Sequence, residues 1–204
     1  MQDQWNSRFA APGHKYGLAP NAWLQAQAHR LAPGSTVLVP GDGEGRNGVW
    51  LAGQGHTVLA LDYAENGLAK ARALAAERGV TAHYHARWAD LADWKGADQP
   101  VDALVLVYCH LPSAVRQRAY ALAATALRPG GWCIVEGFHP RQLDGYGSGG
   151  PKDADMLLTL DALRGDLGPL CEEIVASEGE VRLDEGSGHQ GPGFVTRWLG
   201  RRRA

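Results

Sequence analysis

The sequence has few cysteines, no long apolar run and no excess of charge of either sign. Its three cysteines, Cys109, Cys133 and Cys171, lie far apart and form no CxxC pair, which argues against a disulfide framework and against cysteine zinc or redox motifs. No stretch reaches the roughly 20 apolar residues of a membrane span, and no basic start leads into an apolar segment. We therefore expect reduced thiols in a soluble, cytoplasmic protein without a membrane partner.

The charge balance of the sequence gives no indication of a large charged partner. The 20 Lys+Arg and 22 Asp+Glu residues give a formal net charge of −2, so no broad positive field exists to hold nucleic acid. The sequence specifies no oligomeric state. With 204 residues, 45% of them hydrophobic, the chain is of a size and composition that predict one packed domain over residues 1–204.

Short apolar runs alternate with amphipathic segments through the first two thirds of the chain. Buried strands are expected at 36–39, 57–61 and 103–107. Helical periodicity predicts helices over 21–31, 65–78 and 113–127. For the last of these, Ser113 is the expected N-cap and Pro129-Gly130 the expected stop.

The pattern changes after Phe138. A segment rich in glycine and proline covers 139–152, and a short helix is expected at 160–166. Two strand-like runs, 173–182 and 194–199, are joined by the glycine-rich 184–193 and predict an antiparallel hairpin. The whole pattern favours an α/β fold with a single Rossmann-like, doubly wound, mostly parallel sheet and a C-terminal antiparallel strand.

A glycine-rich turn follows the first predicted strand. Gly41, Gly43 and Gly45 alternate between that strand and a helix, and glycines there let backbone N–H groups approach a ligand closely. Asp62 ends the next strand, where a carboxylate can accept both ribose hydroxyls. Together these residues predict a site for a cofactor that contains adenosine.

The same turn also satisfies GxGxxG, a dinucleotide pattern that is weak by itself. The rest of the chain resembles class I S-adenosylmethionine-dependent methyltransferases. Gly41, Gly43 and Gly45 match their GxGxG loop, Asp62 their ribose acid and Asp90-Leu91 the end of their third strand. Residues 102–107 look like their fourth strand, and 127–136 like the LkPGG turn into the fifth. The resemblance implies S-adenosylmethionine as cofactor.

Within that superfamily the chain is similar to the tellurite-resistance branch and its thiopurine-methyltransferase-like relatives. The similarity lies in Gly45-Arg46-Asn47, in Trp5 to Phe9 and in Tyr16-Gly17. It implies that residues 1–33 fold over the cofactor. The acid that often stands two residues before the first glycine is absent, because that position is Val39. The methionine ammonium must then be held by backbone carbonyls, Asp42 or Glu44.

Each expected cofactor-binding residue either matches the family pattern or lies at a strand end on the same edge of the predicted sheet. They are Tyr16, Gly17, Gly41, Asp42, Gly43, Gly45, Asp62, Tyr63, Asp90, Leu91 and Tyr108.

Three polar side chains are expected to line the pocket of the methyl acceptor, within or next to loops at 139–193. They are His110, Arg141 and His189. His110 is either a base or substrate ligand, or a structural histidine bonded to a nearby carbonyl. Imidazoles and a guanidinium would suit an anionic or soft-atom acceptor. The histidines do not have the spacing of HExxH, so no metal is expected.

The sequence therefore predicts an enzyme that methylates a small molecule such as a thiol, a chalcogen oxyanion or an amine. In-line transfer requires alignment first, and a general base only if the nucleophile arrives protonated. Two alternatives remain: an NAD(P)-dependent oxidoreductase that uses the GxGxxG match, and a regulator that binds the cofactor without turnover.

Overall fold

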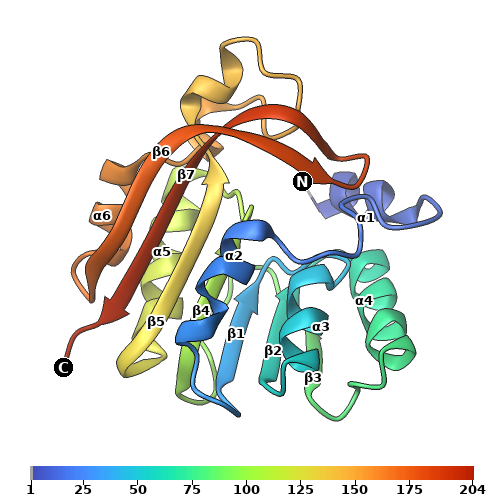
Figure 1. Cartoon of the computed structure of the whole chain (residues 1–204), viewed down its shortest axis with the longest axis vertical. Coiled ribbons are helices and arrows are strands. Elements are labelled where there is room, and N and C mark those ends of the chain that lie inside the picture. The colour runs from blue at the N-terminus through green and yellow to red at the C-terminus, as the bar shows by residue number, and fades with distance from the viewer. Residues whose placement is uncertain (1) are drawn as a thin grey trace.

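The computed structural model describes residues 2–204, in which seven strands form one sheet with helices on both faces (Figure 1). The strands are β1 Thr36–Pro40, β2 Thr57–Asp62, β3 Tyr84–Trp88, β4 Val101–Val107, β5 Leu127–Phe138, β6 Cys171–Glu185 and β7 His189–Arg202. Their order in the sheet is β3-β2-β1-β4-β5-β7-β6. Strands β1 to β5 are parallel, and β7 is antiparallel to both of its neighbours. The predicted fold class is confirmed.

The helices divide between the two faces of this sheet. They are α1 Gln2–Ala10, α2 Ala22–Gln27, α3 Arg46–Gly53, α4 Glu65–Glu77, α5 Ser113–Thr125 and α6 Leu160–Leu167, with short 3-10 turns η1 Ala28–Arg30, η2 Pro140–Leu143 and η3 Ala154–Met156. Successive strand residues point to opposite faces. Accordingly Val37 packs in the cluster with α2, α3 and α4, whereas Leu38 packs in the cluster with α5 and α6.

Helix ends differ from the sequence prediction where distant residues intervene. Ser113 is the first helical residue of α5 instead of its N-cap, and its backbone N–H donates to the Asp155 carboxylate at 2.9 Å. A long-range acid thus takes the capping role that Ser113 was expected to play. Pro129-Gly130 do not stop this helix, because α5 ends at Thr125 and the two residues lie within β5.

The C-terminal hairpin is longer than predicted. Strands β6 and β7 extend so far that only residues 186–188 connect them. Glycines that suggested a loop pair inside the hairpin instead, Gly191 with Leu183 and Gly193 with Val181. Strand β7 continues to Arg202, so Arg201 and Arg202 near the C-terminus belong to the sheet.

The hairpin arches away from the sheet, and its tip meets the N-terminal segment (Figure 1). The Gly188 N–H donates to the Lys15 carbonyl at 2.9 Å. A Cβ added to Gly186 would lie 2.6 Å from the same carbonyl, so glycine permits this close approach. Two segments remote in sequence therefore join above the carboxyl ends of the central strands.

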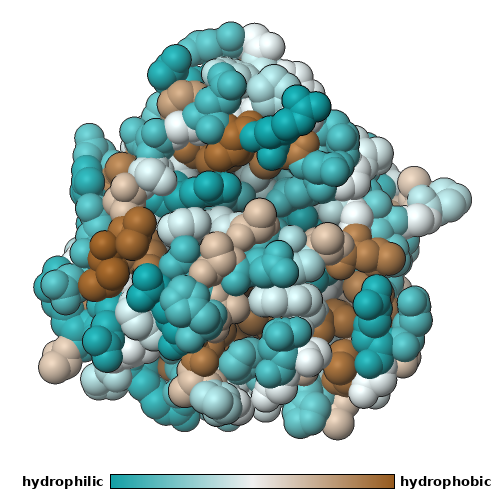
Figure 2. Space-filling model, viewed as in Figure 1, coloured by the Kyte–Doolittle hydropathy of each residue, from teal (hydrophilic) through white to brown (hydrophobic). Residues whose placement is uncertain are grey.

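The visible surface in Figure 2 is mostly hydrophilic, with small and separate hydrophobic patches. Among the described residues, no helix combines the length and the apolar character needed to cross a membrane.

Candidate functional site

A cavity of about 700 Å³ opens at the carboxyl ends of the parallel strands. The strand order reverses between β1 and β4, and such a reversal creates a crevice where ligands bind in open α/β sheets. Most residues predicted from the sequence line this cavity. They are Tyr16, Gly17, Gly41, Asp42, Gly43, Asp62, Tyr63, Asp90, Leu91, Tyr108, His110 and His189.

The glycine turn between β1 and α3 is tied to the end of β2. The Gly41 N–H donates to the Leu61 carbonyl at 2.7 Å, and the Gly43 N–H donates to Oδ2 of Asp62 at 2.8 Å. Oδ1 of Asp62 accepts from the Ala64 N–H at 2.8 Å. Both glycines have φ values in the left-handed region, +71° and +58°, which a side chain would strain. Asp62 thus organises the turn as well as facing the cavity.

Two acids considered for the methionine ammonium are engaged elsewhere. Asp42 accepts hydrogen bonds from the Tyr84 hydroxyl at 2.7 Å and the Gly48 N–H at 3.0 Å. Burial raises the pKa of Asp42 to about 7 despite these hydrogen bonds. Glu44 accepts from Nζ of Lys70 at 2.8 Å and from the Lys15 N–H at 2.7 Å. Both carboxylates therefore brace the turn and the N-terminal segment.

Gly45 and Arg141 do not line the cavity. A Cβ on Gly45 would lie 2.7 Å from Cβ of Ala71, so this glycine lets α3 approach α4 instead of a ligand. The Arg141 guanidinium lies over the Phe194 ring, 4.4 Å from its centroid, and 60% of its side chain is exposed. The prediction that Arg141 lines the acceptor pocket is therefore corrected, because η2 places its side chain on the outer surface.

The structure adds Arg46, which the sequence analysis used only as a family match. Arg46 begins α3 and lines the cavity, and its Nη2 donates to Oε2 of Glu185 at 2.9 Å. Its Nη1 is buried and has no hydrogen-bond partner among the described residues. A buried guanidinium nitrogen of this kind is a donor left for a ligand. The position of Arg46 directly after Gly45 is the sequence feature from which its place in the cavity could have been predicted.

Tyr108 directly follows β4 and has a strained backbone conformation. Its φ of 50° is the only positive value among the non-glycine residues that the structure describes. Strain of this kind concentrates at functional sites, where the surrounding contacts maintain it. The Tyr108 hydroxyl donates to Glu136 at 2.9 Å, and its ring centroid lies 4.4 Å from that of His189 and 4.8 Å from that of Phe138. These rings form an aromatic wall of the cavity.

His110 stands beside that wall with both ring nitrogens bonded to the backbone. Nδ1 lies 2.8 Å from the Met156 carbonyl, and Nε2 accepts from the Phe138 N–H at 3.2 Å. A carbonyl only accepts, so Nδ1 carries the proton and Nε2 the lone pair. Burial lowers the pKa of His110 to about 4, so the ring is neutral at pH 7. Of the two roles considered for His110, this geometry favours the structural one.

The N-terminal segment covers the cavity from the other side. Trp5, Arg8, Phe9 and Tyr16 line it, and the Arg8 guanidinium donates to the Tyr16 hydroxyl at 3.1 Å. Nζ of Lys70 on α4 holds this segment through the Ala11 and Gly13 carbonyls, each at 2.6 Å.

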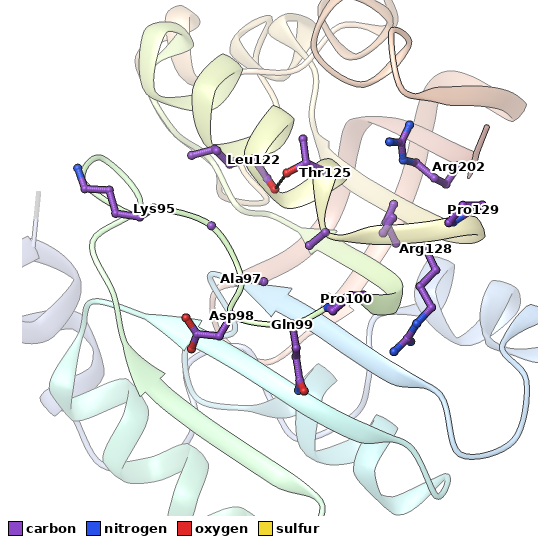
Figure 3. Close-up of a pocket in the computed structure, with 13 residues that line it drawn as sticks. Lys95, Ala97, Asp98, Gln99, Pro100, Leu122, Thr125, Arg128, Pro129 and Arg202 are labelled. Atoms are coloured by element: carbon purple, nitrogen blue, oxygen red, sulfur yellow. Dashed lines mark hydrogen bonds between the residues drawn. The ribbon is translucent and has the colours of Figure 1, made fainter. Parts of the chain in front are cut away.

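A second hollow, of about 590 Å³, lies at the opposite edge of the sheet (Figure 3). Two of its charged side chains form ion pairs: Arg128 pairs with Asp102 at 2.5 Å, and Asp98 pairs with Arg87 at 2.7 Å. These are exposed pairs of the kind that stabilise little, and we assign this hollow no chemistry. Within the described part of the chain, His, Cys, Asp and Glu side chains form no group of three suited to a metal ion.

The fold and the cavity define an α/β protein with a ligand-sized cavity at the carboxyl edge of its sheet. Residues 37–131 match a protein-family profile described as a methyltransferase domain. A search of curated protein sequences gave no match.

Solved structures share the fold at low sequence identity. One, from work on conversion of a disulfide bond into a thioacetal group during echinomycin biosynthesis, has a TM-score of 0.77 at 19% identity over 100% of this chain and 92% of that one. TehB from Haemophilus influenzae has a TM-score of 0.72 at 15% identity over 99% and 67%. The N-methyltransferase NodS from Bradyrhizobium japonicum WM9, in complex with S-adenosyl-L-homocysteine, has a TM-score of 0.68 at 14% identity over 98% of each chain.

Residues 37–131 are thus similar to methyltransferase domains, and the whole chain shares its fold with solved methyltransferases such as NodS. The methyltransferase profile favours a methyl donor over the dinucleotide that the GxGxxG match also allowed. TehB, of the tellurite-resistance branch, shares the fold of this chain.

Proposed function

We propose that this chain transfers a methyl group from the cofactor S-adenosyl-L-methionine to a small molecule, and that both are bound in the 700 Å³ cavity. The observation that supports this proposal is that the cavity is covered by two segments. The N-terminal segment and the tip of the hairpin are joined by the hydrogen bond from the Gly188 N–H to the Lys15 carbonyl. A cavity of this size lies within the roughly 300–1,000 Å³ that is typical of small-molecule sites. A cavity that is covered in this way favours a small acceptor, because a nucleic acid or a folded protein would not enter it.

The residues present fit the cofactor. Asp62 offers a carboxylate to the ribose hydroxyls, and the glycine turn leaves space for close backbone approach. The unpartnered Nη1 of Arg46 is suited to the methionine carboxylate, because a guanidinium donates in the geometry that a carboxylate accepts. With Asp42 and Glu44 engaged, backbone carbonyls of the turn are left for the ammonium group.

The bound cofactor supplies a methyl group on a positively charged sulfur. The chain's own contribution is position, since displacement at carbon requires the acceptor atom in line with the methyl carbon. We assign the acceptor to the side of the cavity formed by Tyr108, Phe138, Met156 and His189. The adenosine lies across from it, at Asp62 and Asp90.

The proposal is tested by two measurements on the purified chain. Calorimetry should show binding of S-adenosylhomocysteine and none of NAD(P). Incubation with labelled S-adenosylmethionine and a panel of small thiols, phenols, amines and chalcogen oxyanions should label at least one class. Tight binding without transfer to any panel member would favour the non-catalytic regulator, and transfer only to a protein or nucleic acid would overturn the proposal.

A further inference from the structure

His189 and Glu185 face each other across the turn of the C-terminal hairpin. Glu185 ends β6, His189 begins β7, and the two are paired in register. Nδ1 of His189 lies 3.0 Å from Oε2 of Glu185, and both side chains are about nine-tenths buried. The hairpin turn therefore fixes a carboxylate and an imidazole against each other at the wall of the cavity.

This contact determines which ring nitrogen carries the proton. An ionised carboxylate only accepts hydrogen bonds, so Nδ1 of His189 is the donor and Nε2 holds the lone pair. Nε2 has no hydrogen-bond partner among the described residues, whereas both nitrogens of His110 are bonded to the backbone. His189 lines the cavity. Of these two histidines, only His189 has a basic nitrogen left for a ligand.

The charges around the pair keep the imidazole neutral and the carboxylate ionised. Burial acts to raise the pKa of Glu185, but the hydrogen bond with His189 and the charge of Arg46 outweigh it and lower the pKa to about 2. Burial lowers the pKa of His189 below its ordinary value of 6.5, although Glu185 acts to raise it. At pH 7 the neutral imidazole of His189 is therefore held by the ionised carboxylate of Glu185.

The other groups packed against His189 are aromatic or paired. The rings of Tyr16, Tyr108 and Phe138 have centroids 4.5, 4.4 and 5.0 Å from its own. Of the nearby cations, Arg46 is matched by Glu185 and Arg197 by Glu136. Arg8 and Lys152 also line the cavity and have no carboxylate partner among the described residues. Aromatic rings pack directly on His189, and the charge of Arg46 beside it is matched by Glu185, so this end of the cavity favours a neutral acceptor over an anion.

We propose that Nε2 of His189 is the general base for methyl transfer, that Glu185 positions it, and that the acceptor is a neutral thiol or phenol. This rests on the proposed function and names its substrate class. The acceptor's sulfur or oxygen forms the bond to the methyl carbon, and the bond from that carbon to the cofactor's sulfur breaks with its electron pair going to sulfur. The acceptor's proton goes to Nε2, which releases it to solvent.

Two thiols separate this role from simple packing. At pH 7 phenylmethanethiol is protonated and needs a base, whereas 4-nitrobenzenethiol is ionised and needs none. His189→Gln should lower kcat/KM for phenylmethanethiol by roughly 10²–10⁴-fold, the usual contribution of general base catalysis. Its effect on 4-nitrobenzenethiol should be at least tenfold smaller. His85→Gln, on the exposed side of β3, is the matched control and should change neither.

The tautomer gives a readout that does not depend on activity. Nitrogen-15 spectra of the cofactor-free protein should show His189 neutral at pH 7 with its proton on Nδ1. Glu185→Gln should change that tautomer distribution and reduce transfer to phenylmethanethiol, and Glu185→Asp should restore part of both. In wild type, transfer to this thiol should fall as pH drops through the lowered pKa of His189, because protonation removes the lone pair.

Specific results would overturn the inference. Equal losses with both thiols in His189→Gln, or a proton on Nε2 in wild type, would reduce His189 to a packing residue. If wild type methylated no thiol and no phenol, the acceptor class would be wrong. The proposed function is judged separately, by S-adenosylhomocysteine binding and by transfer to any other small molecule.

Discussion

Nη2 of Arg46 lies 2.9 Å from Oε2 of Glu185 and joins the first residue of α3 to the last residue of β6. The cofactor turn and the hairpin are thereby connected through one buried ion pair. Asn21 contributes from the N-terminal side, since its side-chain amide donates to Glu185 at 2.9 Å and to Glu136 at 2.6 Å. Four segments that are distant in sequence, at Asn21, Arg46, Glu136 and Glu185, thus share one polar network.

Replacing Arg46 with lysine should separate the two functions of its guanidinium. A lysine keeps the charge beside Glu185 but cannot also serve the methionine carboxylate. We expect Arg46→Lys to weaken S-adenosylhomocysteine binding by about 1.5–3 kcal/mol, the usual value for a hydrogen bond to a charged group. Binding of 5′-methylthioadenosine, which lacks the amino acid portion, should hardly change. Equal losses for both ligands in calorimetry would show that Arg46 acts on the turn alone.

Removing the Asp62 carboxylate should impair the ribose site. Asp62→Ala should weaken S-adenosylhomocysteine binding by about 1.5–3 kcal/mol. It should also lower the melting temperature, because Gly43 and Ala64 lose their common acceptor. Calorimetry at a temperature where circular dichroism shows the variant folded separates the two effects. Unchanged affinity in the folded variant would place the ribose elsewhere.

Gly45 is expected to matter for stability because of its close contact with α4. Its φ is +86°, and an added Cβ would lie 2.7 Å from Cβ of Ala71. Backbone strain and overpacking together should make Gly45→Ala less stable by roughly 2–4 kcal/mol in urea unfolding. Gly53→Ala, at the last residue of α3 with open space around the added Cβ, is the control and should be neutral or slightly stabilising. Similar stability of the two variants would contradict the close packing of α3 on α4.

Asp42 should make stability depend on pH. Burial raises its pKa from 3.8 to about 7, so the folded chain holds a proton that the unfolded chain releases between these values. The stability from this group is therefore present at low pH and is lost as pH rises toward 7. Asp42→Asn should grow more stable relative to wild type over this range, by up to about 4 kcal/mol at about 1.4 kcal/mol per pH unit. Urea unfolding at several pH values measures the difference, and a constant difference would mean that Asp42 is ionised in the folded state.

Much of the fold and of the cofactor side could be predicted from the sequence because the signals there are local. Apolar runs such as 36–39 and 103–107 form strands wherever they are buried, and glycines next to a strand end indicate a turn that needs their backbone freedom. The place of Asp62 in the site could be predicted because the residue lies at the end of a strand. The strand order of a doubly wound sheet then brings these residues to one edge.

The acceptor side depended on the tertiary structure. Arg141, His110 and His189 have the same sequence signal, a polar residue in or next to an expected loop. The fold placed Arg141 on the outer surface, bonded His110 to two backbone groups and left Nε2 of His189 without a partner among the described residues. Strand pairing across the hairpin set Glu185 against His189, and helix α3 brought Arg46 to Glu185 from 139 positions away. Local sequence determines which groups are available, but their hydrogen-bond partners and pKa values depend on contacts that form only when distant segments pack together.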